Sequence, residues 1–206
     1  MCLALITCSF LPFATRFLYR HPTKLRLLRQ HWADDKGRFG KVAALIGKDA
    51  NLVEETFYEL ECKEPLFREP KEWAGMPMHA MIYYVLVRLM QPEIVVETGV
   101  CEGLSSRLLL RAMERNGRGV LHSIDLPNGN EELGPGKGRQ INFLPQGKET
   151  GWMVPNHLRT RRRLYLGDAK ELLPKVLLEV GAIDMFIHDS LHSYEHMLFF
   201  RNFRQE

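Results

Sequence analysis

The spacing of apolar residues along the chain changes near Pro92. Before it, apolar residues recur at helical spacing in four segments: 24–32, 41–47, 51–61 (where Asn51 is expected to cap the helix) and 79–90. After it, short β-branched runs predict strands at 94–97, 120–125, 164–168 and 183–189, separated by helices at 105–115, 169–180 and from 192 onward. This alternation predicts an α/β fold with a parallel sheet and helices on both of its faces.

Proline and glycine residues at 65, 70 and 75–77 interrupt the helical pattern and set the expected domain boundary. We predict a helical N-terminal extension over residues 1–75 and a sheet domain over residues 76–206. Residues 1–14 are apolar but too few to span a membrane, which takes about 20 residues. They also lack the basic start of a signal peptide. We therefore expect a peripheral helix or a start codon placed too early, and no stable membrane insertion.

Composition narrows the class of protein only slightly. A net charge of +3 is too small to argue for nucleic acid, and the arginines at 159–163 are interpreted as a solvated face. The four cysteines show neither paired nor metal-type spacing, which is typical of a cytoplasmic protein. Residues 127–159 are rich in glycine and proline and longer than an ordinary loop, so we predict a lid over a site. The oligomeric state is left open, a homo-oligomer included.

A glycine loop follows the first of these strands. Glu97 stands at the strand end, and Gly99 and Gly103 frame the turn into the next helix. Gly99 permits a tight turn, and Gly103 lets the backbone approach a ligand at a helix N-terminus. The E-x-G-x-x-x-G spacing departs from the dinucleotide fingerprint, and a carboxylate here suits a cationic ligand better than a pyrophosphate. A glycine turn that binds nothing is the alternative.

Acidic residues also end the next three strands. Asp125 can accept hydrogen bonds from both hydroxyl groups of a ribose, as the residue at this position does in NAD enzymes. In the alternative, Asp125 is part of a simple Asp-x-Pro turn. Asp168 can accept a hydrogen bond from an adenine amino group, cap the helix at 169–180, or do both. Because ligands bind outside the carboxyl ends of parallel strands, these acids predict one site along one edge of the sheet.

A dense polar cluster runs from His188 to His196 after the fourth predicted strand. Asp189 can ligate Mg²⁺ or anchor a substrate, and His192 can remove a proton from a hydroxyl group. In the alternative, Asp189 or Ser190 caps the last helix and His192 lies at its surface. Zinc held by the three histidines is disfavoured, because His188 lies in a strand and no H-E-x-x-H motif is present.

Together, four segments resemble class I S-adenosylmethionine-dependent methyltransferases, above all the O-methyltransferases related to macrocin O-methyltransferase. The segments are 95–106, 123–127, 166–168 and 187–194. The resemblance implies a Rossmann-like fold, of which the first four strands are present, and S-adenosylmethionine as the cofactor. It also implies an enzyme that methylates a hydroxyl group of a small molecule, with no nucleic-acid partner.

The resemblance implies roles for individual residues as well. For the cofactor these are Glu97, Gly99 and Gly103 along its methionine part, Ser105 or Ser106 beside them, Asp125 at the ribose and Asp168 at the adenine end. Asp189 would be the metal ligand, with Mg²⁺ as the metal, and together with His192 it would be catalytic.

Relatives of this kind continue with a fifth strand, a G-G turn and paired acids that complete the metal site. The present sequence ends at Glu206, inside the helix after the fourth of the predicted strands, so we expect an incomplete domain. Two rival functions stay open. One is an NAD(P)-dependent oxidoreductase with a degenerate glycine loop, which Glu97 and the glycine spacing disfavour. The other is a non-catalytic cofactor-binding or interaction protein.

Overall fold

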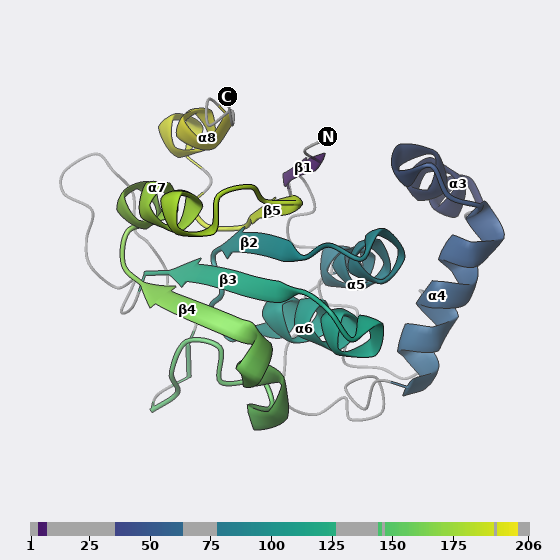
Figure 1. Ribbon diagram of the computed structural model, residues 1–206, viewed down its shortest axis with the longest axis horizontal. Helices are drawn as coiled ribbons and strands as arrows, with labels where there is room; N and C mark the ends of the chain where they lie inside the picture. Colours follow the sequence, from purple (N-terminus) through teal and green to yellow (C-terminus); the bar gives the residue numbers. More distant parts are fainter. Residues whose placement is uncertain are drawn as a thin grey trace. The chain divides into compact units, whose positions relative to one another are not determined.

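The computed structural model describes residues 4–7, 36–63, 78–126, 144–145, 147–191 and 193–201 (Figure 1). Its elements are, in chain order, β1 (Ala4–Thr7), α3 (Lys36–Ile46), α4 (Ala50–Lys63), α5 (Met78–Met90), β2 (Ile94–Thr98), α6 (Leu104–Asn116), β3 (Val120–Asp125), the 3₁₀ helix η2 (Asn156–Arg161), β4 (Arg162–Leu166), α7 (Ala169–Val180), β5 (Met185–His188) and α8 (Tyr194–Arg201). The predicted helix at 24–32 lies outside the described residues.

Contacts within the chain separate two units. The helical unit is Ser9–Gln91, and the sheet unit joins Met1–Cys8 to Pro92–Glu206. The boundary expected at residue 75 therefore falls inside the helical unit, which also contains α5. None of the described helices is long and apolar enough to cross a membrane.

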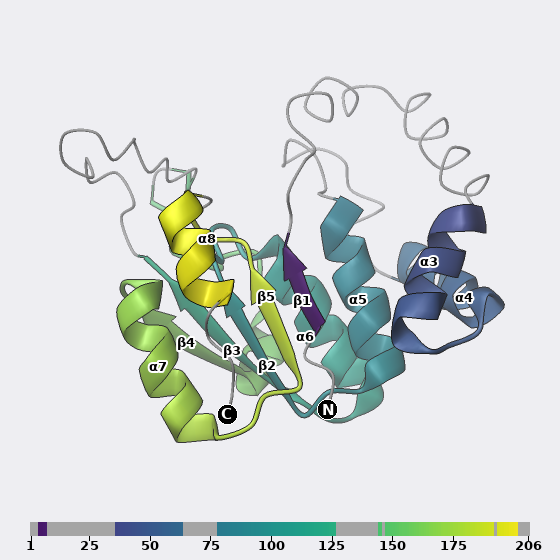
Figure 2. The same cartoon turned by 90° about the horizontal axis from the view of Figure 1, so that it is seen from above.

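The sheet unit is built on parallel strands in the order β1-β5-β2-β3-β4 (Figure 2). β5 is buried at every position and β2 at all but its first. Parallel strands covered on both faces form continuous apolar runs, which explains why the sequence marked these two so clearly. In both views α6 covers one face, and α7 with α8 covers the other. The predicted α/β fold is confirmed.

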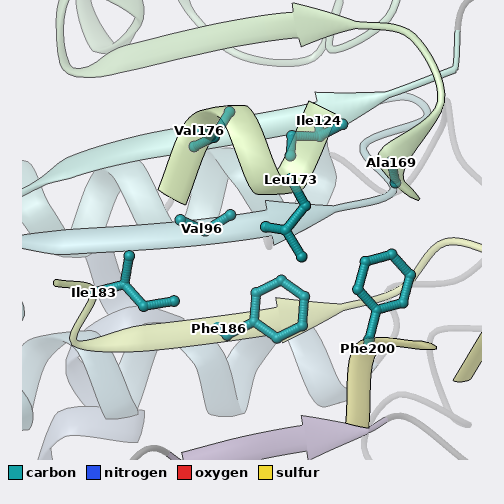
Figure 3. Packing of buried hydrophobic residues seen from close by; sticks show 8 residues of the cluster. All are labelled: Val96, Ile124, Ala169, Leu173, Val176, Ile183, Phe186 and Phe200. Carbon is teal, nitrogen blue, oxygen red and sulfur yellow. The ribbon is translucent and has the colours of Figure 1, made fainter. Parts of the chain in front are cut away.

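Alternate strand residues point to opposite faces of this sheet. Those on one face join α7 and α8 in an apolar cluster (Figure 3): Val96, Ile124, Ala169, Leu173, Val176, Ile183, Phe186 and Phe200. Glu97, next to Val96 in β2, points to the other face, where Ser106 of α6 donates a hydrogen bond to it. The same alternation therefore places this apolar cluster on one face and a buried carboxylate on the other.

The N-terminus contributes a strand, where a peripheral helix was expected. Ala4–Thr7 pairs in parallel with Met185–His188, from Ala4 opposite Met185 to Thr7 opposite His188. A short apolar run fits a strand beside a buried strand as well as a helix, and periodicity alone does not separate the two. Residues 1–8 thus belong to the sheet unit, although the whole helical unit follows them in sequence.

The helical unit contains α3, α4 and α5, and Glu59 of α4 links α4 to α5. The Tyr84 hydroxyl donates to Glu59 Oε1 at 3.4 Å, and Arg88 Nη2 donates to Glu59 Oε2 at 3.3 Å. Asp49 Oδ1 accepts the backbone N–H of Asn51 at 2.8 Å at the start of α4. Asp49 is therefore the cap, and the expectation that Asn51 caps this helix was wrong by two residues.

Candidate functional site

The carboxyl ends of β2, β3, β4 and β5 lie along one edge of the sheet, because all four strands run in parallel. The four predicted acids are all found there. Glu97 lies near the end of β2, Asp125 ends β3, Asp168 follows β4 by two residues, and Asp189 follows β5 directly. The structure thus brings together the carboxylates that the sequence assigned to one site.

Glu97 is a buried carboxyl group whose two oxygens have different surroundings. Its Oε1 accepts hydrogen bonds from the hydroxyls of Ser106 and, at 2.7 Å, Ser123. Burial raises the pKa of Glu97 to about 7, although both serine hydrogen bonds and the Arg162 charge lower it, while Asp125 adds a smaller rise. Its Oε2 is buried and meets no donor among the described residues. Because an unpartnered buried carboxylate oxygen is costly, this atom suits a cationic or hydrogen-bond-donating ligand.

Arg162 brings the opposite charge into the same interior, whereas the sequence had placed it on a solvated face. Burial lowers the pKa of its guanidinium, and the Glu97 charge opposes this. Its Nη1 is buried and meets no acceptor in the described part of the chain. The strand was expected to begin at residue 164, and β4 in fact begins at Arg162. Had the strand been extended to the arginines, its alternation would have turned every second one inward.

Gly99 and Gly103 have different neighbours, and neither could be replaced without strain. Gly99 has φ +89°, and a Cβ there would collide with the Asp189 carbonyl and lie 2.7 Å from the Ser190 nitrogen. Gly103 has φ +90°, and a Cβ there would lie 2.7 Å from the Cα of Gly151. The close approach expected at Gly103 is therefore made, in this structure, by another part of the chain.

Asp125 is held from two sides. Its Oδ1 accepts the Val100 backbone N–H at 3.1 Å, and its Oδ2 accepts the Thr150 hydroxyl at 2.9 Å. Thr150 lies in the segment predicted as a lid, of which residues 127–143 and 146 lie outside the described part. Nothing in the sequence singled out Thr150, because its partner is 25 positions away and no short motif joins them.

Asp168, Ser105 and Ser106 also lie at the edge formed by the carboxyl ends of the strands. Asp168 Oδ1 accepts the Lys170 backbone N–H at 2.7 Å, so its predicted role as cap of α7 is confirmed. Its contact with an adenine stays a prediction. Ser106 is buried and tied to Glu97, while Ser105 is half-buried in the first turn of α6.

A polar network of Thr98, His188, Ser190 and His196 lies beside Asp189. His188 Nδ1 is 2.8 Å from Thr98 Oγ1, and Ser190 Oγ is 3.0 Å from His196 Nε2 and 3.3 Å from His188 Nδ1. The Asp189 backbone N–H donates to the Thr98 carbonyl at 2.8 Å. The ends of β2 and β5 and the start of α8 are thus fixed to one another around Asp189.

Of the two residues predicted to be catalytic, the structure describes Asp189 but not His192. Asp189 stands at the end of β5, but His192 lies outside the described residues. Within the described ranges, no group of three or more His, Cys, Asp or Glu side chains could hold a metal ion. The described residues therefore do not fit the Mg²⁺ site expected at Asp189.

The sequence profile of a methyltransferase domain family matches residues 96–203, slightly more than half of the chain. The chain belongs to this methyltransferase family. The match runs from β2 into α8 and contains the glycine loop and all four acids. It confirms the family resemblance seen in the sequence. No curated protein matches the chain.

The solved structures similar to this chain include several methyltransferases. TomG, an O-methyltransferase from Streptomyces achromogenes in complex with S-adenosylmethionine, is 18% identical with a TM-score of 0.42, over 83% of this chain and 70% of TomG. PaMTH1 from Podospora anserina, bound to S-adenosylhomocysteine, is 14% identical with a TM-score of 0.38, over 89% of this chain. An O-methyltransferase from Bacillus cereus in complex with S-adenosylhomocysteine is 13% identical with a TM-score of 0.36, over 75% of this chain. The chain spans 62% of PaMTH1 and 60% of the Bacillus cereus protein, less than two thirds of either.

Proposed function

We propose that this chain binds S-adenosylmethionine across the carboxyl ends of β2 and β3 and takes part in methyl transfer to a hydroxyl group of a small molecule. The observation that carries the proposal is the buried Oε2 of Glu97, which meets no donor among the described residues. S-adenosylmethionine offers an ammonium and a sulfonium, whereas NAD offers a pyrophosphate. A nearby cation favours the ionised form of a buried carboxyl group, and a nearby anion opposes it.

The remaining residues at this edge suit an adenosyl group. Each carboxylate oxygen can accept two hydrogen bonds, and the described residues supply one to each oxygen of Asp125, which leaves one position on each for the ribose hydroxyls. The residues proposed to hold the cofactor are Glu97, Gly99 and Gly103 at the methionine part, Ser105 and Ser106 beside them, Asp125 at the ribose and Asp168 at the adenine end.

When bound, the cofactor supplies a methyl group already activated by its positive sulfur. The residues of this chain then have to align donor and acceptor and remove the acceptor's proton. We assign removal of the acceptor's hydroxyl proton to His192. We assign the anchoring of the acceptor hydroxyl to Asp189, whose backbone the polar network holds in place. The proposal contains no step at a metal, because the described residues provide no donor set for Mg²⁺.

Other expectations stay predictions at this point. They are a small-molecule acceptor, no nucleic-acid partner and a cytoplasmic location; the oligomeric state, a homo-oligomer included, is left open. Membership of the methyltransferase family counts against the NAD(P)-dependent oxidoreductase. A non-catalytic cofactor-binding protein would share the binding site described above and differ from the enzyme only in lacking turnover.

Isothermal titration calorimetry with S-adenosylmethionine, S-adenosylhomocysteine and NAD⁺ tests the proposal. We expect both adenosyl ligands to bind with micromolar Kd and NAD⁺ to give no binding heat. Asp125→Ala should weaken binding by about a hundredfold, because it removes two charge-assisted hydrogen bonds to the ribose, each of which contributes about 1.5 kcal/mol or more. Asp184→Ala is the matched control, since Asp184 accepts hydrogen bonds from the backbone N–H groups of Glu93 and Ile94 at the start of β2, at the opposite end of the strand from the site. Absence of binding by both adenosyl ligands, or equal binding of NAD⁺, contradicts the proposal.

A further inference from the structure

The turn formed by residues 147–154, here called the docked turn, lies against the glycine loop. The Gly151 N–H donates to the Cys101 carbonyl at 2.8 Å, and the Met153 N–H donates to the Glu102 carbonyl at 2.9 Å. Gly103 and Gly151 face each other so closely that a Cβ on Gly103 would lie 2.7 Å from the Gly151 Cα. Backbone hydrogen bonds and an approach that only glycine permits thus fix the docked turn to the loop.

The docked turn presents Thr150 to Asp125. The Thr150 hydroxyl donates to Oδ2 at 2.9 Å, while the Val100 N–H of the glycine loop donates to Oδ1 at 3.1 Å. Two donors from two different segments therefore restrain the Asp125 carboxylate, one at each oxygen. Hydrogen bonds from the protein to an ionised group are stronger than those between neutral groups, so this restraint is substantial.

We propose that Thr150 is a positioning residue for the ribose of the bound cofactor. The inference rests on the proposed function, and it adds a residue that acts through Asp125 without itself contacting the ligand. Held by Thr150 and Val100, the carboxylate directs its remaining acceptor positions away from the protein and toward a diol. A side chain ordered before binding loses less conformational freedom on binding, which strengthens the interaction with the ligand.

Thr150→Val removes the hydroxyl and keeps the size and branching of the side chain. We expect it to weaken S-adenosylhomocysteine binding by about fivefold to tenfold, which is less than the full value of one hydrogen bond to a charged group because Thr150 acts through Asp125. Thr150→Ser keeps the donor and should bind like the wild type. Thr150→Ala removes the same hydroxyl together with the γ-methyl group and adds no new atoms, so it gives a second measurement that no steric clash can affect. Thr160→Val is the matched control, because Thr160 is exposed and its hydroxyl donates to the nearby His157 carbonyl, at 3.2 Å.

Two further measurements separate positioning of the ribose from a general effect on folding. With the 2′-deoxyribose analogue of S-adenosylhomocysteine, the loss of affinity caused by Thr150→Val should shrink to about twofold or less. The analogue lacks one of the two hydroxyl groups that donate hydrogen bonds to Asp125. In an Asp125→Ala background, Thr150→Val should cause no further loss, because coupled residues are not additive. A positioning role predicts both results.

The possible failures are distinguishable. If the wild type does not bind S-adenosylhomocysteine, the proposed function fails and the inference fails with it. If the wild type binds and Thr150→Val and Thr150→Ala bind equally well or more tightly, the inference alone is overturned. An equal loss for both ligands, or a loss that persists without Asp125, also overturns it and assigns Thr150 a purely structural role.

Discussion

A carboxyl group that ionises near pH 7 in the folded protein makes stability depend on pH, and Glu97 is such a group. In the unfolded chain it loses its proton at its ordinary pKa of 4.5, and in the folded chain burial holds the pKa at about 7. Between these values the folded state binds more protons than the unfolded state. The stability that this group contributes is therefore fully present below pH 4.5 and is lost as the pH rises through about 7.

Glu97→Gln tests this dependence by removing the titration and keeping a similar shape. For the wild type we expect the free energy of unfolding to fall by about 3 kcal/mol between pH 4.5 and 7.5 through this group. Urea unfolding from pH 4.5 to 8 should show that decline in the wild type and lack it in the variant. Glu171→Gln, an exposed glutamate in α7, should keep the wild-type profile. Parallel profiles for wild type and Glu97→Gln contradict the assignment of the titration to Glu97.

At the scale of elements, the turn after β2 and the turn after β5 depend on each other. Gly99 donates its N–H to the Ile124 carbonyl at 2.9 Å, and the backbone at Asp189 and Ser190 passes directly over its missing Cβ. Gly117, at the end of α6, also has a positive φ, but a Cβ there would meet nothing within 4 Å. The two glycines therefore share backbone strain and differ in steric contact.

Gly99→Ala and Gly117→Ala separate these two costs. Gly117→Ala should lower the free energy of unfolding by about 1 kcal/mol, the cost of an unfavourable backbone conformation. Gly99→Ala should lower it by roughly 3 kcal/mol or more, since the new methyl group must displace the backbone that follows β5. Chemical denaturation measures both values. Equal losses would show that the close approach at Gly99 has no energetic consequence.

Periodicity predicted the strands and α-helices that follow Pro92 closely, because burial imposes a period on each of them. β3 and α7 have the predicted bounds, β2, α6, β4 and β5 begin and end within two residues of theirs, and α8 begins two residues after its predicted start. The 3₁₀ helix η2 was not predicted, because most of it falls in the segment expected to be a lid. β4 is the exception, since its first residues are arginines and Arg162, which is half-buried with its Nη1 atom fully covered, was taken for a surface residue. A residue's charge indicates a surface position on average and does not reveal its local partners.

The candidate site was predictable to the extent that it lies at strand ends. The four acids stand directly at or after the predicted strands, so the parallel topology alone brings them together. Thr150 and Ser123 were missed for different reasons. Ser123 is one polar position within a buried strand, whereas Thr150 reaches Asp125 through a tertiary contact that no local pattern encodes.

At the scale of the whole molecule, the feature that no sequence pattern indicated is the pairing of β1 with β5. The two strands are about 180 positions apart in the sequence, and the helical unit lies between them. β1 covers the side of β5 that faces away from β2. Without it, β5 would be an edge strand with unpaired backbone groups, and apolar edge strands invite association with other chains.

Deleting residues 1–8 tests the contribution of β1. We expect the free energy of unfolding of the sheet unit to fall by about 2 kcal/mol, because the hydrogen bonds of a four-residue strand are lost and each contributes roughly 0.5–1.5 kcal/mol net. Hydrogen exchange should speed up at the β5 amides, residues 185–188, and stay unchanged in β3, which keeps both of its neighbours. A chain lacking only residues 1–3, which precede β1, is the control. If β5 exchanges at the same rate with and without residues 1–8, then β1 does not protect this edge, and the sheet unit ends at β5.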